Sequence, residues 1–81
     1  MKIAVISDYK NFQAFIAENN LPKDDFKCVS KPHHVEGYRF DYYVVLYTFL
    51  DIGDCQRALI QLKVPHINEE SLILLYNKLW K

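Results

Sequence analysis

The chain has 81 residues, of which 51% are hydrophobic and 25% charged, a composition typical of a globular domain and not of a disordered chain. We therefore expect one domain over residues 1–81. Ten basic and ten acidic side chains give a formal net charge of zero, so no overall field draws the protein to nucleic acid or to an anionic membrane.

The first predicted element is a strand over residues 3–6, whose sequence Ile-Ala-Val-Ile is apolar on both faces, as in central parallel strands. Asp8 follows as a predicted N-cap, because its carboxylate can accept hydrogen bonds from the free amides of the next turn. An amphipathic helix then runs to a stop signal at residues 19–22. Its apolar positions are Phe12, Phe15, Ile16 and Leu21.

Two further strands are predicted in the middle of the chain. Phe26–Val29 alternates enough to form a strand, and Tyr42–Tyr47 is aromatic and β-branched almost throughout. The second of these runs has no polar face, which is typical of a strand covered on both sides. The polar connection between them, residues 30–41, is long enough to cross the end of the sheet.

Two helices are predicted to complete the chain. The first covers residues 54–63, begins at Asp54 as its N-cap and ends before Val64-Pro65. The second begins at Asn68 as its N-cap and carries two glutamates in its first turn, where carboxylates favour the positive end of the helix dipole. Its apolar positions are Leu72, Leu75, Tyr76 and Leu79.

This order of elements, β-α-β-β-α-α, predicts an α/β fold with a minimal three-stranded parallel sheet and flanking helices. A strand–helix–strand opening implies a right-handed parallel crossover. We expect the third strand on the other side of the first, which gives the sheet order 2-1-3. The first helix should lie on one face, and one or both later helices on the other.

The predicted sheet has two edges that differ in protection. Lys27 places a charge on the edge formed by Phe26–Val29, whereas residues 42–49 carry none. Either Val64–Ile67 pairs with the unprotected edge as a fourth strand, or a second copy or a partner does. Because Pro65 has no amide for a ladder, we favour self-association, as a homodimer, or the binding of a partner.

The cysteines and the first residues indicate the cellular compartment. Cys28 and Cys55 lack the paired spacing of zinc or redox sites, so we expect both to be reduced and in or near the core. The four apolar residues before Ser7 are too few for a signal peptide or a membrane span. We therefore predict a cytoplasmic protein without a membrane segment.

The sequence contains no motif for a cofactor or a metal. The first strand leads into residues 7–11 without a glycine, and neither glycine of the chain belongs to a Walker pattern, so both usual phosphate loops are missing. His33 and His34 are adjacent on a loop, where we expect them to point apart and to be exposed. We predict no cofactor and no metal.

The carboxyl ends of the first and third strands bring polar side chains to one rim, which is where open α/β sheets bind ligands. These groups either hold a ligand, such as a divalent ion, or serve as helix caps, and we favour the caps. The rim residues are Ser7, Asp8, Thr48 and Asp51.

Aromatic residues are concentrated between positions 38 and 49. Such a density is typical either of a small core filled with large side chains or of a protein-binding surface. Tyr38, Arg39 and Phe40 lie on the connection and not on a strand, which makes them the stronger surface candidates. The predicted partner-binding residues are Tyr38, Arg39, Phe40, Tyr47 and Phe49.

Four segments follow one another in a familiar pattern: a helix that ends in an Asn-Leu step, a short strand, a loop and an apolar strand. They are residues 15–21, 26–29, 35–39 and 43–46. Over roughly residues 1–50 the chain resembles small uncharacterised phage-encoded α/β proteins, with Glu36 where that loop usually has arginine. The resemblance implies a nucleotide-hydrolase-like or Rossmann-like scaffold without its phosphate loop, an origin in a phage genome, and no catalytic residue.

We therefore expect a non-enzymatic, phage-type module that binds a host, defence or replication protein stoichiometrically in the host cell cytoplasm. The alternative is a small ligand- or nucleotide-binding domain, or an enzyme, that uses the strand-end rim. Nucleic acid is not an expected partner, because acidic residues interrupt the thin basic set of Lys23, Lys27, Lys31 and Arg39.

Overall fold

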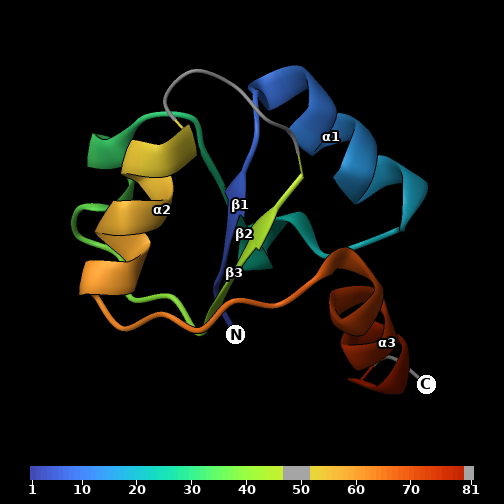
Figure 1. Ribbon diagram of the computed structural model, residues 1–81. Helices are drawn as coiled ribbons and strands as arrows, with labels where there is room; N and C mark the ends of the chain where they lie inside the picture. The colour runs from blue at the N-terminus through green and yellow to red at the C-terminus, as the bar shows by residue number, and fades with distance from the viewer. Residues whose placement is uncertain (47–51, 80–81) are drawn as a thin grey trace.

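The computed structural model of the protein describes residues 1–46 and 52–79. The elements in chain order are β1 (Ile3–Ile6), α1 (Tyr9–Glu18), the 3₁₀ helix η1 (Lys23–Asp25), β2 (Phe26–Val29), the 3₁₀ helix η2 (Pro32–Val35), β3 (Tyr42–Val45), α2 (Ile52–Gln61) and α3 (Glu69–Leu79). The strands form a parallel sheet in the order β2-β1-β3, with helices on both faces (Figure 1). This confirms the predicted α/β fold and strand order.

β1 is the central strand of the sheet because its four side chains are all apolar. It pairs in parallel with β2 on one side and with β3 on the other, so that Val5 lies between Cys28 and Val44. Every residue of β1 is fully buried. A run without a polar face therefore lies where neither face of the sheet meets water.

α1 begins where the sequence predicts. The carboxylate of Asp8 accepts a hydrogen bond from the amide of Asn11 at 3.3 Å, which is the contact of a helix N-cap. The chain turns away after the helix at Asn20, whose φ of 52° lies in the left-handed region that asparagine tolerates. The buried residues of α1 are Phe12, Phe15 and Ile16, as their spacing predicts.

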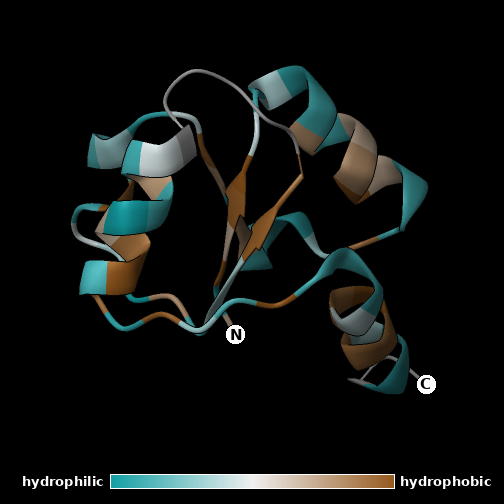
Figure 2. Cartoon of the chain, viewed as in Figure 1, coloured by the Kyte–Doolittle hydropathy of each residue, from teal (hydrophilic) through white to brown (hydrophobic). Residues whose placement is uncertain are grey.

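The helices are divided between the two faces of the sheet. One core joins Val5 to Phe15 of α1 and Leu72 of α3, and the other joins Ile6 to Leu59 of α2. Figure 1 shows α2 on one side of the sheet and α1 and α3 on the other, and the strands between them are apolar (Figure 2). The sequence left open whether one or both of the later helices lie opposite α1. In the structure only α2 does, and α3 lies on the same face as α1.

The outer edge of β3 pairs with the segment that follows α2. The amide of Tyr43 donates to the carbonyl of Pro65 at 3.0 Å, and the amide of Ile67 donates to the carbonyl of Tyr43 at 2.9 Å. The expectation that this edge is open to a second copy or a partner is therefore wrong at Tyr43, where residues 64–67 contribute one parallel bridge. Pro65 does not prevent the pairing, because the bridge uses its carbonyl and needs no amide from residue 65.

The last two helices begin differently. Asn68 caps α3 as predicted, since its Oδ1 accepts from the amide of Ser71 at 2.8 Å. Asp54 is not the N-cap that the sequence predicts, because α2 already begins at Ile52. Asp54 lies instead in the first turn of α2, where its charge favours the helix dipole and forms an exposed ion pair with Arg57 at 3.8 Å.

Both cysteines have the expected kind of environment, since Cys55 is fully buried and Cys28 is half-buried. None of the helices in the described parts of the chain has the length and apolar character needed to cross a membrane. β3 ends at Val45, and the predicted end of that strand at Tyr47 lies outside the described residues.

Candidate functional site

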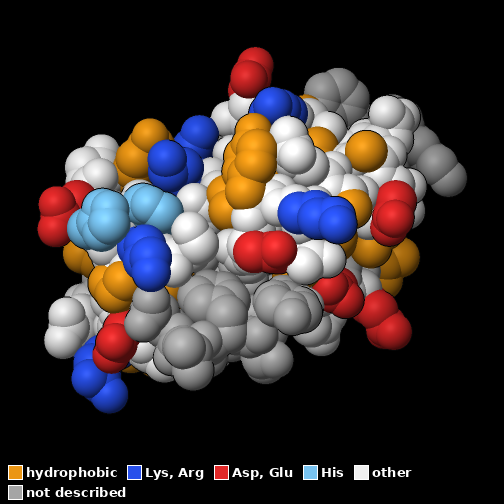
Figure 3. All heavy atoms as spheres, turned by 90° about the horizontal axis from the view of Figure 1, so that it is seen from above, with side chains coloured by type: hydrophobic (Ala, Val, Ile, Leu, Met, Phe, Trp, Pro, Cys, Tyr) orange, Lys and Arg blue, Asp and Glu red, His pale blue; other side chains and the backbone are white. Residues whose placement is uncertain are grey.

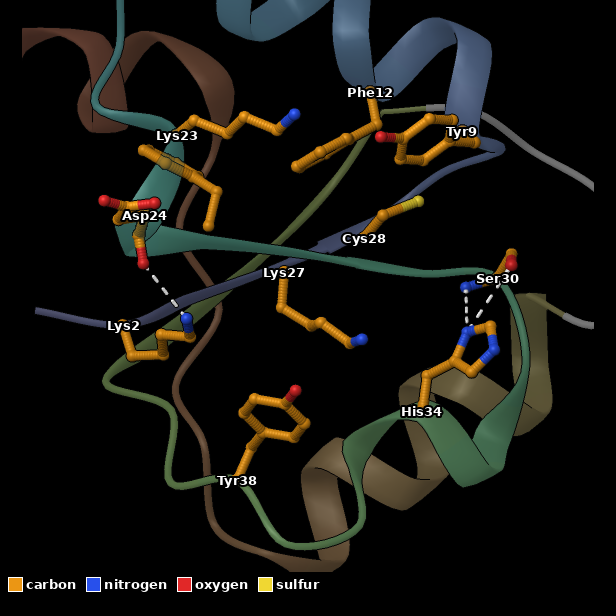
Figure 4. Close-up of a pocket in the computed structure, with 11 residues that line it drawn as sticks. Lys2, Tyr9, Phe12, Lys23, Asp24, Lys27, Cys28, Ser30, His34 and Tyr38 are labelled. Carbon is orange, nitrogen blue, oxygen red and sulfur yellow. Dashed lines mark hydrogen bonds between the residues drawn. The ribbon is translucent and has the colours of Figure 1, made fainter.

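A groove of about 580 Å³ runs along the outer edge of β2. Among the described residues, no other strand pairs with this edge. Figure 4 views the groove with β2 across the middle, α1 above it and the loop that carries Tyr38 below it. This β2 groove has walls formed by Tyr9, Phe12, Lys2 and Tyr38, with Lys27 and Cys28 of β2 at its base.

β2 directs its side chains alternately to the two sides of the β2 groove. Lys27 points toward Tyr38, whereas Cys28 points toward α1 (Figure 4). Phe26, two residues before Cys28, is buried in the core that α1 and α3 cover. This alternation follows from strand geometry, in which successive side chains point to opposite faces. The groove therefore has two chemically different sides.

Tyr38 and two lysines form the basic side of the groove. The ring centroid of Tyr38 lies 5.2 Å from Nζ of Lys27 and 5.7 Å from Nζ of Lys2, within the range of a cation–π interaction. Tyr38 also stacks on Phe40, with ring centroids 5.6 Å apart, and remains 42% exposed. Tyr38, the first of the predicted partner-binding residues, is thus an exposed aromatic ring near two positively charged side chains.

The other predicted partner-binding residues differ in exposure. Arg39 is exposed, and Phe40 is half-buried against the core on the α2 side of the sheet. Tyr47 and Phe49 lie outside the described residues. Of the three that the structure describes, only Tyr38 lines the β2 groove.

The first turn of α1 forms the apolar side of the groove. Tyr9 is 55% exposed, and its ring centroid lies 6.0 Å from that of the buried Phe12. Lys23 of η1 also lies on this side, near Phe12 (Figure 4). Sequence reasoning missed Lys2, Tyr9 and Lys23 as site residues, because they come from different segments. The only signal was the i, i+3 spacing of Tyr9 and Phe12 at the start of a helix.

Positive charge exceeds negative charge in the β2 groove. Lys2, Lys23 and Lys27 line it, and among the described lining residues Asp24 is the one acidic side chain. Nζ of Lys2 donates to the backbone carbonyl of Asp24 at 3.0 Å, a contact that orients the ammonium group without neutralising its charge. The groove is therefore an electropositive site on a protein of zero formal net charge.

His33 and His34 lie together, with ring centroids 4.6 Å apart, and do not point apart as the sequence predicts. The reason is that Nδ1 of His34 accepts from the amides of Ser30 and Lys31, both at 3.2 Å, which fixes its ring against the preceding turn. Figure 3 shows histidine side chains side by side, with basic side chains next to them. Burial and the neighbouring positive charges lower the pKa of His34, so a neutral imidazole closes one end of the β2 groove.

The strand-end rim contains a helix cap. Ser7 is fully buried, and its Oγ donates to the backbone carbonyl of Asp8 at 2.9 Å. The carboxylate of Asp8 accepts from Nδ2 of Asn11 at 2.6 Å, and this hydrogen bond lowers the pKa of Asp8. Asp8 is thus the N-cap of α1, and Ser7 is hydrogen-bonded to the backbone of Asp8. Thr48 and Asp51 lie outside the described residues.

Two observations bear on metal binding and on the reactivity of the Cys28 thiol in residues 1–46 and 52–79. Within these ranges, no three His, Cys, Asp or Glu side chains are grouped so that they could hold a metal ion. The thiol of Cys28 donates to the carbonyl of Ser7 at 3.3 Å, and burial raises the pKa of that thiol. A raised pKa disfavours the thiolate, so Cys28 has the character of a packing residue and not of an activated nucleophile.

Comparison with known protein families, with curated proteins and with solved structures finds no match to this chain. The resemblance to phage-encoded α/β proteins therefore stays a prediction.

Proposed function

We propose that this protein is a non-enzymatic binding module that holds an acidic segment of another protein in the β2 groove. The observation that carries the proposal is the meeting of Lys2, Lys27 and the exposed Tyr38 ring on one side of the groove. Ammonium groups attract carboxylates, while an aromatic ring supplies apolar contact of the kind found at interface cores. The partner class expected from the sequence, a host, defence or replication protein, is thereby narrowed to one with an acidic segment.

A peptide suits this groove better than a small phosphate ligand does. The base of the groove is a strand edge, which presents backbone carbonyls as well as amides. Carbonyl oxygens repel phosphate oxygens, whereas a peptide offers donors and acceptors in turn. Lys23 also lies on the opposite side of β2 from Lys27 (Figure 4), so the three lysines do not all converge on one point as basic groups around a phosphate do.

The test is the binding of a fluorescein-labelled peptide of alternating glutamate and glycine, measured by fluorescence anisotropy. We expect Lys27→Gln to weaken binding up to about fivefold, because one partly exposed ion pair contributes at most about 1 kcal/mol. The substitution keeps most of the aliphatic stem of Lys27 and removes the charge that lies near the Tyr38 ring. The affinity of the unmodified protein should also fall as the salt concentration rises.

Lys78→Gln is the matched control, since Lys78 is an exposed lysine of α3 that does not line the β2 groove. This variant should bind the peptide as the unmodified protein does. Equal affinities of the Lys27→Gln and Lys78→Gln variants would contradict the proposal. So would tripolyphosphate that binds more tightly than the peptide and depends on Lys27, a result that would assign the groove to a small anionic ligand.

A further inference from the structure

We propose that the partner's acidic segment binds as an added β-strand paired with β2, and that acidic residues alternate with apolar ones along it. This inference rests on the function proposed above and specifies how the segment is held. β2 has four residues, a length of about 13 Å at roughly 3.3 Å per residue. Its complement is therefore a short extended segment.

The backbone of β2 has an open position at Cys28. The amide of Ser7 donates to the carbonyl of Val29 at 3.2 Å, so the backbone groups of Val29 face β1. The N–H and C=O groups of successive strand residues point to opposite sides, so those of Cys28 point away from β1 and into the β2 groove. Edge groups of this kind are a template for pairing with another chain.

The outward amides on either side of Cys28 are already used by the protein. The amide of Phe26 donates to the carbonyl of Lys23 in η1. The amide of Ser30 donates to Nδ1 of His34 at 3.2 Å. An added strand therefore finds one complete N–H and C=O pair on this edge, and its register is centred on Cys28.

The two sides of the groove determine which side chains an added strand needs. Side chains of paired strands alternate in step, so a residue opposite Cys28 points to the side of Tyr9 and Phe12 (Figure 4). The residues before and after it point to the side of Lys27 and Tyr38. An apolar side chain suits the first environment, and a carboxylate suits the second.

The charge of the groove argues against a second copy of this chain as the occupant. Two β2 edges brought together would place the lysines of both copies near one another, and like charges on paired strands are destabilising. The excess of Lys2, Lys23 and Lys27 over Asp24 instead calls for a partner of opposite charge.

The experiment compares a labelled peptide of alternating valine and glutamate with two isomers that are N-methylated on the backbone. One isomer carries its methyl groups on the valine amides, and the other carries them on the glutamate amides. If the peptide is antiparallel to β2, the valine opposite Cys28 makes both hydrogen bonds to the backbone of Cys28. If the peptide is parallel, the two glutamates on either side of that valine make these hydrogen bonds instead. Only one set of amides faces β2, so we expect one isomer to bind about tenfold more weakly than the other.

A peptide with all its valines before its glutamates is the matched control, because it has the same composition and charge. We expect it to bind more weakly than the alternating peptide. Equal affinities of the two methylated isomers would overturn strand addition, since no particular set of amides would then face the protein. If Lys27→Gln still weakens the unmethylated peptide in that case, the proposed function stands and the mode of binding is wrong. Failure of every peptide to bind overturns both proposals.

Discussion

At the scale of single residues, His34 couples the β2 groove to pH. Its Nδ1 accepts hydrogen bonds from the amides of Ser30 and Lys31, which only the neutral imidazole can do. Lys27 of β2, together with His33 and Lys31 of its own turn, surrounds the ring with positive charge. Burial and these charges lower the pKa of His34, so the folded protein holds it in the accepting form.

We therefore predict that the protein loses stability as the pH falls below about 6.5, the ordinary pKa of histidine. Because the pKa of His34 is lower in the folded state, the unfolded chain takes up the proton first and is favoured at acid pH. Urea denaturation at about pH 7.5 and about pH 5 should show a lower midpoint at the acid pH. The change should be smaller in His34→Asn, whose amide oxygen accepts without titrating.

The control for this prediction is His66→Asn, because His66 is an exposed histidine that lies outside the turn holding His34 and does not affect the pKa of His34. This variant should keep the pH dependence of the unmodified protein. If His34→Asn keeps it as well, the capping role of the His34 imidazole is not what makes stability depend on pH.

At the scale of elements, the segment that follows α2 completes the sheet without forming a regular strand. Tyr43 donates to Pro65 and accepts from Ile67, and Ile67 also packs against the core that α1 and α3 cover. α3 is attached at its other side through Tyr76, whose hydroxyl donates to Asp25 of η1 at 2.8 Å. Burial and the contact with Asp25 hold the pKa of Tyr76 well above its ordinary value, so the hydroxyl stays a donor.

We predict that the amides of Tyr43 and Ile67 are protected from hydrogen exchange although the bridge between them is isolated. The amide of His66, which alternates away from β3, should exchange much faster. Exchange measured by NMR in heavy water checks this, with the amides of β1 as the protected reference. Fast exchange at Ile67 while β1 stays protected would show that the bridge does not persist in solution.

At the scale of the whole molecule, the two edges of the sheet differ from the sequence-based expectation in which one is paired and which one is open. The β3 edge, which carries no charge, is paired at Tyr43 by the chain itself. The β2 edge, which Lys27 was expected to protect, is the open one and forms the base of a groove. Lysine on an edge discourages pairing with a like-charged copy but favours an acidic strand.

We predict that the protein alone is a monomer of 9.6 kDa whose mass in sedimentation equilibrium does not depend on concentration. The reason is that the lysines around the β2 edge repel a second copy, while the backbone of Tyr43 is already paired. Self-association that persists at high and low salt would contradict this and restore the homodimer that we expected from the sequence.

The sequence by itself determined the elements, their order and the sheet topology. Strand and helix periods are local properties, and the caps at Asp8 and Asn68 depend on hydrogen bonds that reach only three residues along the chain. The order β2-β1-β3 agrees with the apolar side chains of β1 on both faces, which suit the central position of the sheet. Tyr38 could also be predicted from sequence as a surface residue, because an aromatic side chain on a loop between strands does not belong to the buried face of a strand.

Only the tertiary structure decided where the groove lies and what it contains. Lys2, Tyr9 and Lys23 become neighbours of Tyr38 through the parallel register of β1 and β2, which no local pattern encodes. The sequence offered the pairing of residues 64–67 with the β3 edge as an alternative, and Pro65 argued against it because proline has no N–H to donate. The structure makes this pairing through the carbonyl of Pro65, which remains a normal acceptor. Contacts within a turn are determined by neighbouring residues, whereas a site built from separate elements exists only once those elements have packed.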